Sequence, residues 1–227
     1  MRKKIGASLA SLGLGFVGLT ATATPAAADV PCTITNFSPH SVTVGLTPTT
    51  VQFNVTSSGC ELTDWDLTTD DYLFFAYKDS PQETLNPWNE ERGYHHVMAT
   101  AYNADYNSTE HVFANGFTLK RRTAWQSGTF NASPEPVAKG KPITIKGRLM
   151  VVDWDNDRYY GYGNQSVKIQ FRTSTGTYAT VKTVTTRSDG WVSTSVTAQR
   201  SGSWRVYYSG HSAAGSSTVT GDNVPVT

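Results

Sequence analysis

Apolar and polar residues alternate in short segments through the second half of the chain. The alternation is clearest over residues 143–149, 167–172 and 204–208. Successive side chains of a β-strand point to opposite faces, so a period of two over such lengths is typical of a strand with one buried face. Turn-forming residues separate the segments, at 139–142, 175–177, 188–190 and 201–203. This pattern, with no convincing helix, predicts a β-sandwich of about seven strands.

The first half also reads as strands, although less clearly. Strand-like runs lie at 42–44, 51–55, 72–77, 94–102 and 112–119. Residues 78–93 separate two of these runs, and we expect the first half to be most irregular there. A turn-rich stretch at 126–136 divides the halves into pieces of ordinary domain size. We therefore predict an all-β chain of two β-sandwich domains in tandem, at 29–125 and 126–227.

The N-terminus has the pattern of a secretory signal peptide over residues 1–28. Arg2, Lys3 and Lys4 precede a weakly apolar run that extends to about residue 23, and Ala26 and Ala28 form a small-residue cleavage site. An uncleaved membrane anchor is the alternative, but Gly, Ser and Thr interrupt the apolar run. We expect a mature chain that begins at Asp29, is secreted and has no membrane segment.

Charge is distributed unevenly along this chain. The whole sequence has 19 basic and 18 acidic residues, and without residues 1–28 it has 16 and 18. Residues 29–125 have a net charge of −7, and residues 126–227 one of +5. The balance excludes a strongly basic nucleic-acid-binding protein, whereas the second half alone suits a polyanion. Three explanations stay open: the halves associate with each other, they have separate partners of opposite sign, or their surface charges are unrelated.

Cys32 and Cys60 are the two cysteines of the chain. An even pair in an exported protein predicts a disulfide, here between strands near the N-terminus. Closing a loop of this size stabilises a chain by roughly 3 to 4 kcal/mol in the chain-entropy model. The alternative is a pair of free thiols that serve as nucleophile or metal ligand.

Three carboxylates at alternate positions follow one of the predicted strands, at Asp153, Asp155 and Asp157. Oxygen ligands in such a pattern suit calcium, the one cofactor that the residues suggest. An EF-hand would need Gly and Glu where the chain has Arg158 and Asn164. The remaining interpretations are a calcium site completed by backbone carbonyls, or solvated acids at a strand end.

The same segment is rich in aromatic residues. Trp154, Tyr159, Tyr160 and Tyr162 lie close together with Arg158. Rings beside hydrogen-bonding groups suit a glycan or peptide surface, and loops at sandwich ends often carry binding residues. This loop is the predicted ligand-binding site, and the alternative is that its rings cover the open end of the sandwich.

No catalytic residue is predicted. Ser212 follows Gly210 as in a hydrolase elbow, but the second glycine and the helix are missing. His95 and His96 are adjacent in a strand and therefore point to opposite faces, so they do not chelate one ion together. The basic triplet at 120–122 is expected to be a solvated strand end. A zinc site at His111 and a hydrolase around His95, His96 and nearby acids are the competing hypotheses.

Residues 130–210 resemble the bacterial Ig-like modules of secreted actinobacterial proteins. The segments that carry the resemblance are 140–147, 164–172, 178–183, 189–190 and 202–210. It implies an Ig-like second domain, and the first half is similar to the companion domain of such tandem proteins. Modules of this kind are generally spacers or adhesive and ligand-binding units, so the resemblance supplies no catalytic residues.

The sequence thus predicts a secreted, non-enzymatic module that binds or builds extracellular structures. Its expected partners are a glycan, an anionic cell-wall polymer or an extracellular protein, and neither nucleic acid nor membrane. A secreted hydrolase with its site in the first domain, and an inhibitor of a secreted protein, are the alternatives.

Overall fold

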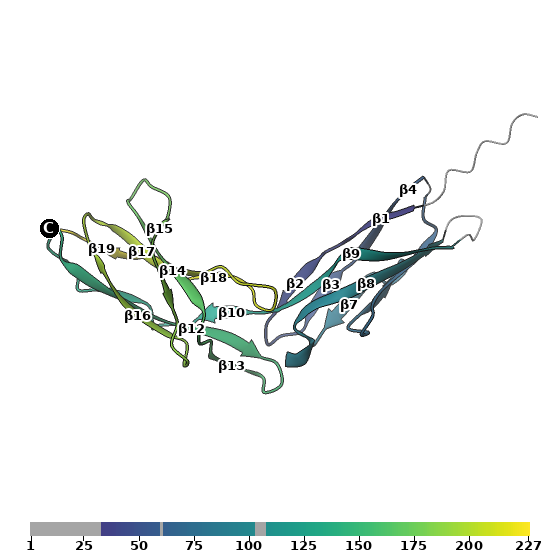
Figure 1. The fold of residues 1–227 in the computed structure, drawn as a ribbon, viewed down its shortest axis with the longest axis horizontal. Helices are drawn as coiled ribbons and strands as arrows, with labels where there is room; N and C mark the ends of the chain where they lie inside the picture. Colours follow the sequence, from purple (N-terminus) through teal and green to yellow (C-terminus); the bar gives the residue numbers. More distant parts are fainter. Residues whose placement is uncertain (1–32, 60, 103–107) are drawn as a thin grey trace, which may run out of the picture. The chain divides into compact units, whose positions relative to one another are not determined.

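Short strands make up most of the chain in the computed structural model, which describes residues 33–59, 61–102 and 108–227 (Figure 1). No α-helix occurs in these ranges, and their one helical element is the 3₁₀ turn η1 (Asn89–Glu91). No helix of the described residues is long and apolar enough to cross a membrane. The prediction of an all-β fold is confirmed.

Strands β1 to β9, the first sandwich, form a five-stranded sheet and two strand pairs. The large sheet has the order β2 (Ser41–Val44), β9 (Ser108–Arg121), β8 (Gly93–Tyr102), β5 (Asp64–Thr69) and β6 (Phe75–Tyr77). The pairs are β1 (Thr33–Ser38) with β4 (Asn54–Ser58), and β3 (Thr49–Gln52) with β7 (Gln82–Leu85). Strand β7 and turn η1 lie in the segment predicted to be irregular.

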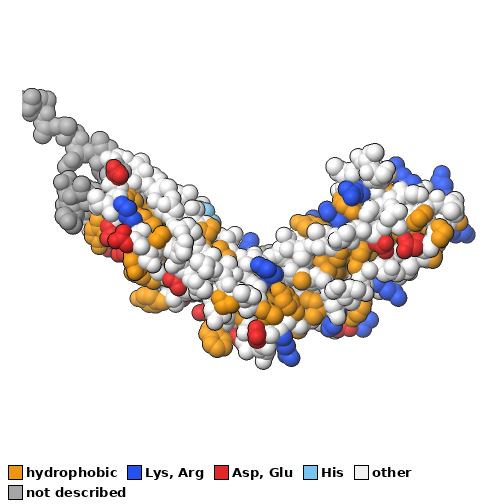
Figure 2. Space-filling view, turned by 180° about the vertical axis from the view of Figure 1, so that it is seen from behind, with side chains coloured by type: hydrophobic (Ala, Val, Ile, Leu, Met, Phe, Trp, Pro, Cys, Tyr) orange, Lys and Arg blue, Asp and Glu red, His pale blue; other side chains and the backbone are white. Residues whose placement is uncertain are grey.

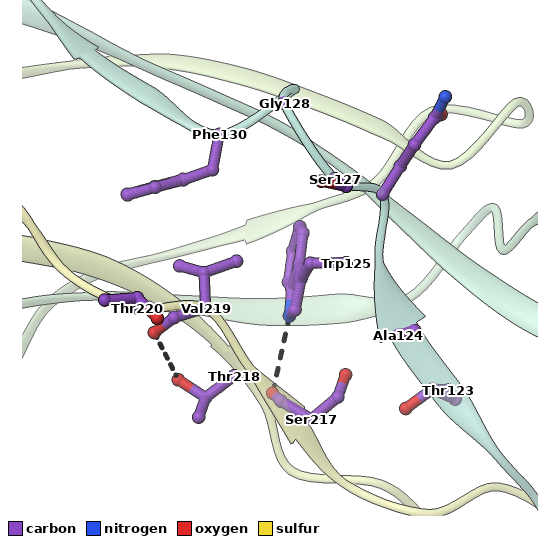
Figure 3. A pocket seen from close by; sticks show the side chains of 11 residues that line it. Thr123, Ala124, Trp125, Ser127, Gly128, Phe130, Ser217, Thr218, Val219 and Thr220 are labelled. Carbon is purple, nitrogen blue, oxygen red and sulfur yellow. Dashed lines mark hydrogen bonds between the residues drawn. The ribbon is translucent and has the colours of Figure 1, made fainter.

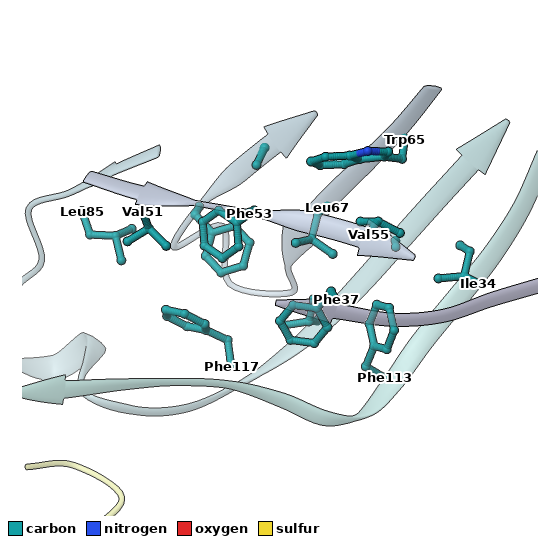
Figure 4. Close-up of a cluster of buried hydrophobic side chains, with 14 of the residues drawn as sticks. Ile34, Phe37, Val51, Phe53, Val55, Trp65, Leu67, Leu85, Phe113 and Phe117 are labelled. Atoms are coloured by element: carbon teal, nitrogen blue, oxygen red, sulfur yellow. The ribbon is translucent and has the colours of Figure 1, made fainter. Parts of the chain in front are cut away.

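Aromatic side chains fill the core of the first sandwich (Figure 4). Phe53 lies between β3 and β4, and its ring centroid is 4.3 Å from that of Phe74 and 5.9 Å from that of Phe117. All three rings are buried. Burial of each phenylalanine contributes about 1.5 to 3 kcal/mol, so this cluster is a main source of cohesion between the strands.

Strands β10 to β19, the second sandwich, form two sheets. In one, β12 (Pro142–Asp153) pairs with β11 (Asn131–Ser133) and β16 (Trp191–Thr197), and its later residues pair with β10 (Thr123–Trp125) and β13 (Arg158–Gly161). The other has the order β15 (Ala179–Thr185), β14 (Ser166–Arg172), β17 (Gly202–Tyr208) and β18 (Ser217–Thr218), with β19 (Asp222–Val224) also on β17.

This strand order is the Ig type. Counted from β11, the first, second and fifth strands of the Greek key are β11, β12 and β16, and they share one sheet. Strands β14, β15, β17 and β19 form the other sheet. Its core is a second hydrophobic cluster made by alternate residues of β12, β14 and β17. The fold class is therefore two β-sandwiches in tandem, the second Ig-like. Strand β10 pairs with β12, so hydrogen bonding of the second sandwich begins at Thr123; the division of the chain after residue 125 stays a proposal.

Each sandwich begins with a chain that changes sheets. In the first, β1 pairs with β4 and the chain then runs parallel to β9 as β2, past a cis peptide at Ser38-Pro39. In the second, β11 pairs with β12, and Val137 then bridges Val226 in parallel. In each sandwich, the chain thus pairs first with one sheet and then with the other.

Candidate functional site

The predicted binding loop forms the end of β12, a turn and β13. Trp154 is half-buried: its indole packs against the core of the first sandwich, and its Nε1 donates a hydrogen bond of 2.9 Å to the Gly45 carbonyl. Arg158 is exposed, with its Nε 3.6 Å from an oxygen of Asp153. Tyr159 lines a cavity of about 290 Å³ together with residues 45–49 and Arg122. The loop therefore does not present its rings on one common surface.

Two further tyrosines of the loop are hydrogen-bonded, Tyr160 to the buried Arg121 and Tyr162 to the exposed His211. Arg121 donates from Nη1 to the Tyr160 hydroxyl at 2.9 Å, and its guanidinium lies 5.7 Å from the centroid of Tyr162. The Tyr162 hydroxyl is 2.8 Å from Nε2 of His211. Arg121 is buried, so the prediction of a solvated basic triplet is wrong for this residue. Burial and the positive charges of Arg121 and Lys120 lower the pKa of His211.

The carboxylates of this loop accept hydrogen bonds from Asn89. Its Nδ2 donates to Asp153 at 2.6 Å and to Asp155 at 2.9 Å, and its Oδ1 accepts from the Trp154 amide. Burial of Asp153 opposes ionisation, but hydrogen bonds from Asn89 and Asn156 outweigh it and lower the pKa of this carboxyl. Thus an amide group lies between the two acids.

Calcium binding by these acids stays a prediction. Asp157 is exposed and lies in the turn, with φ of 47°. Within the described ranges, no three side chains of His, Cys, Asp or Glu are grouped in a way that could hold a metal ion. The surroundings of His111 therefore give no support to the zinc hypothesis.

His95 is the buried histidine of the first sandwich. Its Nδ1 is 2.6 Å from Asp71 and its Nε2 is 2.7 Å from the Glu91 carbonyl, so acceptors face both nitrogens. Asp71 and the Glu91 carbonyl thus contact both ring nitrogens, and neither nitrogen is left open toward a substrate. His96 is exposed on the opposite face, as predicted from strand alternation.

Both cysteines, Cys32 and Cys60, lie outside the described residues. Thr33 pairs with Ser58 in the β1–β4 ladder, so the two strands are adjacent where they approach the cysteine positions in the sequence. The disulfide stays a prediction. Ser212 lies in a tight turn closed by hydrogen bonds between His211 and Ala214, with no helix after it.

A groove of about 700 Å³ lies in the second sandwich (Figure 3). One wall is β10 and the turn that follows it; the other is β18 with Val219 and Thr220. These walls belong to different sheets, so the groove lies along the open edge between them. We call it the Trp125 groove, because the indole of Trp125 lies across its centre.

A missing side chain in β12 makes room for the aromatic rings of the groove. Gly147 is an inward position of β12, and a Cβ there would lie 3.3 Å from the Trp125 ring and 3.7 Å from that of Phe130. The two rings therefore pack over the Gly147 backbone. The indole Nε1 also lies 3.4 Å from the Ser217 carbonyl on the opposite wall. This support holds the indole in one orientation.

The remaining lining of the Trp125 groove is uncharged and mostly polar. Hydroxyl and amide side chains surround the rings, and none of the lining residues is Asp, Glu, Lys, Arg or His. Ser127, Thr220 and Gln126 are exposed at the rim. An aromatic ring bordered by neutral hydrogen-bonding groups binds a ligand with an apolar face and neutral polar edges.

Sequence reasoning missed this site. Trp125 stands 92 positions before Ser217, and neither pattern nor spacing connects the two. One signal was available: Gly147 interrupts the alternation of Ile145 and Leu149 at an inward position. Glycine inside a strand often marks close approach of another group, here two aromatic rings.

Comparison with known proteins gives weak likenesses. No protein-family model matches the chain, and no curated protein matches it either. Among solved structures, fibronectin(III)-like modules of Clostridium thermocellum CbhA are similar with a TM-score of 0.40 and 13% identity, over 86% of this chain and 93% of that one.

The D00-D0 domain of intimin is similar with a TM-score of 0.28 and 13% identity, over 83% of this chain and 98% of that one. A 1.5-MDa bacterial ice-binding adhesin is similar with a TM-score of 0.31 and 12% identity, over 87% of this chain and 65% of that one. The assignment of the fold rests on the strand pairing of this chain itself.

Proposed function

We propose that this chain is an exported, non-enzymatic binding module, and that the Trp125 groove holds a neutral glycan. Export is supported by the signal-like pattern of residues 1–28. The observation that carries the binding role is the uncharged groove of about 700 Å³ with a fixed indole in it. This volume is within the range of about 300 to 1,000 Å³ that is usual for ligand sites.

The chemistry of the lining selects the ligand class. One face of a sugar ring is made of C–H groups and packs on an indole, while the hydroxyls at its edge exchange hydrogen bonds with Ser, Thr and Gln side chains. Charged ligands would lose hydration without gaining a counter-charge, because the lining has none. A neutral polysaccharide meets both conditions.

The non-enzymatic role is supported by the environment of His95. Its two ring nitrogens face Asp71 and a backbone carbonyl, so the ring is held in place rather than left open toward a substrate. General base catalysis needs a nitrogen that can reach the nucleophile. Both nitrogens of His95 are already in contact with protein groups, which argues against His95 as the base of the hydrolase alternative.

Affinity electrophoresis and calorimetry of residues 29–227 with soluble neutral polysaccharides, for example xylan, β-glucan and chitin oligomers, test the proposal. Trp125→Ala is expected to weaken binding at least tenfold. Trp191→Ala is the matched control, because Trp191 lies on β16 and does not line the groove. Binding should be unchanged in that variant.

Trp125 also packs against the core, so a second variant separates binding from folding. Thr220 is exposed on the rim, and Thr220→Arg fills the groove without contact with the core. It should abolish binding and leave the melting temperature unchanged. Failure of every neutral polysaccharide to bind, or binding that survives both variants, would overturn the proposal.

A further inference from the structure

A second surface of this chain has a different chemistry from the groove. The outward face of β14 and β17 presents Lys168, Arg172 and Arg205, which lie at outward positions of two paired strands. We call these three residues the basic face. Figure 2 shows Lys and Arg side chains spread over the second sandwich on the side that it draws. The basic face supplies three of the positive charges behind the net +5 of residues 126–227.

Two of these cations lie over one tyrosine ring. The guanidinium carbon of Arg205 is 3.8 Å from the centroid of Tyr178, and that of Arg172 is 4.7 Å from the same centroid. Two like charges that share one ring repel each other when no counter-charge is near. The ring offsets part of this repulsion, since a cation is attracted to an aromatic face.

The tyrosine itself is fixed to the sheet. Its hydroxyl is 2.8 Å from the Ser203 hydroxyl. A Cβ at residue 221 would lie only 2.1 Å from each of these two oxygens, so the glycine at position 221 leaves room for the contact. On β17, Arg205 is oriented further by a bond of 2.8 Å from its Nε to Gln170 Oε1. The two guanidinium groups are therefore pre-positioned rather than free to move apart.

Among the described residues, the cations of the basic face have no carboxylate partner, since the three ion pairs found there involve other residues. Within the same ranges, neither Arg172 nor Arg205 donates a hydrogen bond from its terminal nitrogens, although five N–H groups make each guanidinium a strong donor. Guanidinium forks with free donors match the geometry of a phosphate group.

We propose that the basic face binds a phosphate-bearing polymer of the cell-envelope type, with one phosphate contacted by Arg172 and Arg205 and the next beside Lys168. Lys168 lies two residues before Gln170, the β14 residue that pairs with Arg205. Its Nζ is 5.8 Å from the centroid of the Tyr207 ring. A ligand with regularly spaced charges can reach all three cations. This site is separate from the Trp125 groove, and its ligand class is different.

Nucleic acid is the competing phosphate polymer, and the basic face suits it less well. Single-stranded nucleic acid binds through bases stacked on open aromatic rings. The rings of Tyr178 and Tyr207 already have cations over them, so they are not free for bases. Binding to this face therefore depends on the negative charges of the ligand and on the distance between them. A polymer with a phosphate backbone and no bases provides both.

Binding of residues 29–227 to poly(glycerol phosphate), with single-stranded DNA and neutral dextran in parallel, tests the proposal. The double variant Arg172→Gln with Arg205→Gln is expected to lose at least tenfold in affinity for poly(glycerol phosphate). Lys139→Gln with Lys141→Gln is the matched control: it removes the same charge from exposed residues outside the face, and should change affinity less than twofold.

Salt dependence gives a second measurement. Three phosphate contacts predict a slope of log affinity against log salt of about −2, and the double arginine variant should reduce it to less than half of that value. Equal losses in the two double variants would mean that only net charge matters and would overturn the site. Tighter binding of DNA than of poly(glycerol phosphate), or binding to dextran that the double arginine variant abolishes, would overturn the ligand class.

Discussion

Asp71→Asn should destabilise the first sandwich in a way that depends on pH. Asp71 accepts a hydrogen bond of 2.6 Å from His95, whose side chain is only 5% exposed, while the Asp71 side chain is 50% exposed. Hydrogen bonds to charged groups contribute about 1.5 to 3 kcal/mol, and solvent at the exposed partner reduces this value. We expect a loss of about 1 to 2 kcal/mol near neutral pH.

The sign of the pH dependence follows from the carboxyl group. Burial of Asp71 would raise its pKa, but hydrogen bonds from Thr69 and His95 outweigh burial, so the pKa lies below its ordinary value of 3.8. A group whose pKa is lower in the folded state stabilises it fully above the unfolded pKa. That contribution is lost as pH falls through the folded pKa. The difference between wild type and Asp71→Asn should therefore shrink below about pH 4.

Urea unfolding at pH 6 and at pH 3, followed by tryptophan fluorescence, measures both quantities. Asp70→Asn is the control, since Asp70 is the adjacent carboxylate, is exposed and has no ion pair among the described residues. It removes the same charge and should leave the midpoint nearly unchanged. Equal effects of the two variants, or an effect of Asp71→Asn that is as large at pH 3 as at pH 6, would refute the reasoning.

Three further predictions concern other parts of the chain. Cys32 and Cys60 should resist alkylation unless reduced, and replacing both by serine should cost about 3 kcal/mol in urea unfolding; two alkylated thiols in the native protein would exclude the bond. Gly147→Val should cost about 1 to 3 kcal/mol and alter near-ultraviolet circular dichroism, because its side chain displaces the indole of the groove; an unchanged spectrum would contradict this packing. Asn89→Ala should raise the pKa of Asp153 in an NMR titration, since it removes a hydrogen bond to that carboxylate, and an unchanged value would contradict the contact.

The binding loop shows where sequence reasoning reached its limit. Ring-rich composition at 154–162 indicated an exposed recognition surface, yet Trp154 donates to Gly45 and packs on a core formed by residues far away in the sequence. Arg121 was likewise expected in solvent and is buried beside Tyr160. Composition reports which residues are near one another along the chain, but exposure depends on what the rest of the chain places above them.

Turn chemistry was only partly informative. Asp189-Gly190 indicated a tight turn, and Gly190 has φ of 84° with its amide bonded to the Arg187 carbonyl. This turn does not close a hairpin, because the strands on either side, β15 and β16, belong to different sheets. A turn fixes the direction of the chain locally, whereas the partner of each strand is chosen by long-range pairing.

Local physics determined the all-β character of this protein. Period-two alternation and turn residues between segments act within a few positions, so they are visible in the sequence before any partner strand is known. The distribution of charge, with acids in the first half and bases in the second, was likewise visible by counting.

Tertiary structure alone decided where binding chemistry is concentrated. The Trp125 groove needs β10 beside β18, and the basic face needs Arg172 and Arg205 on one ring. Each arrangement joins residues separated by tens of positions, through sheet pairings whose register depends on burying the right faces together. The sequence therefore contains the chemical groups, and the pairing of strands brings them within reach of one ligand.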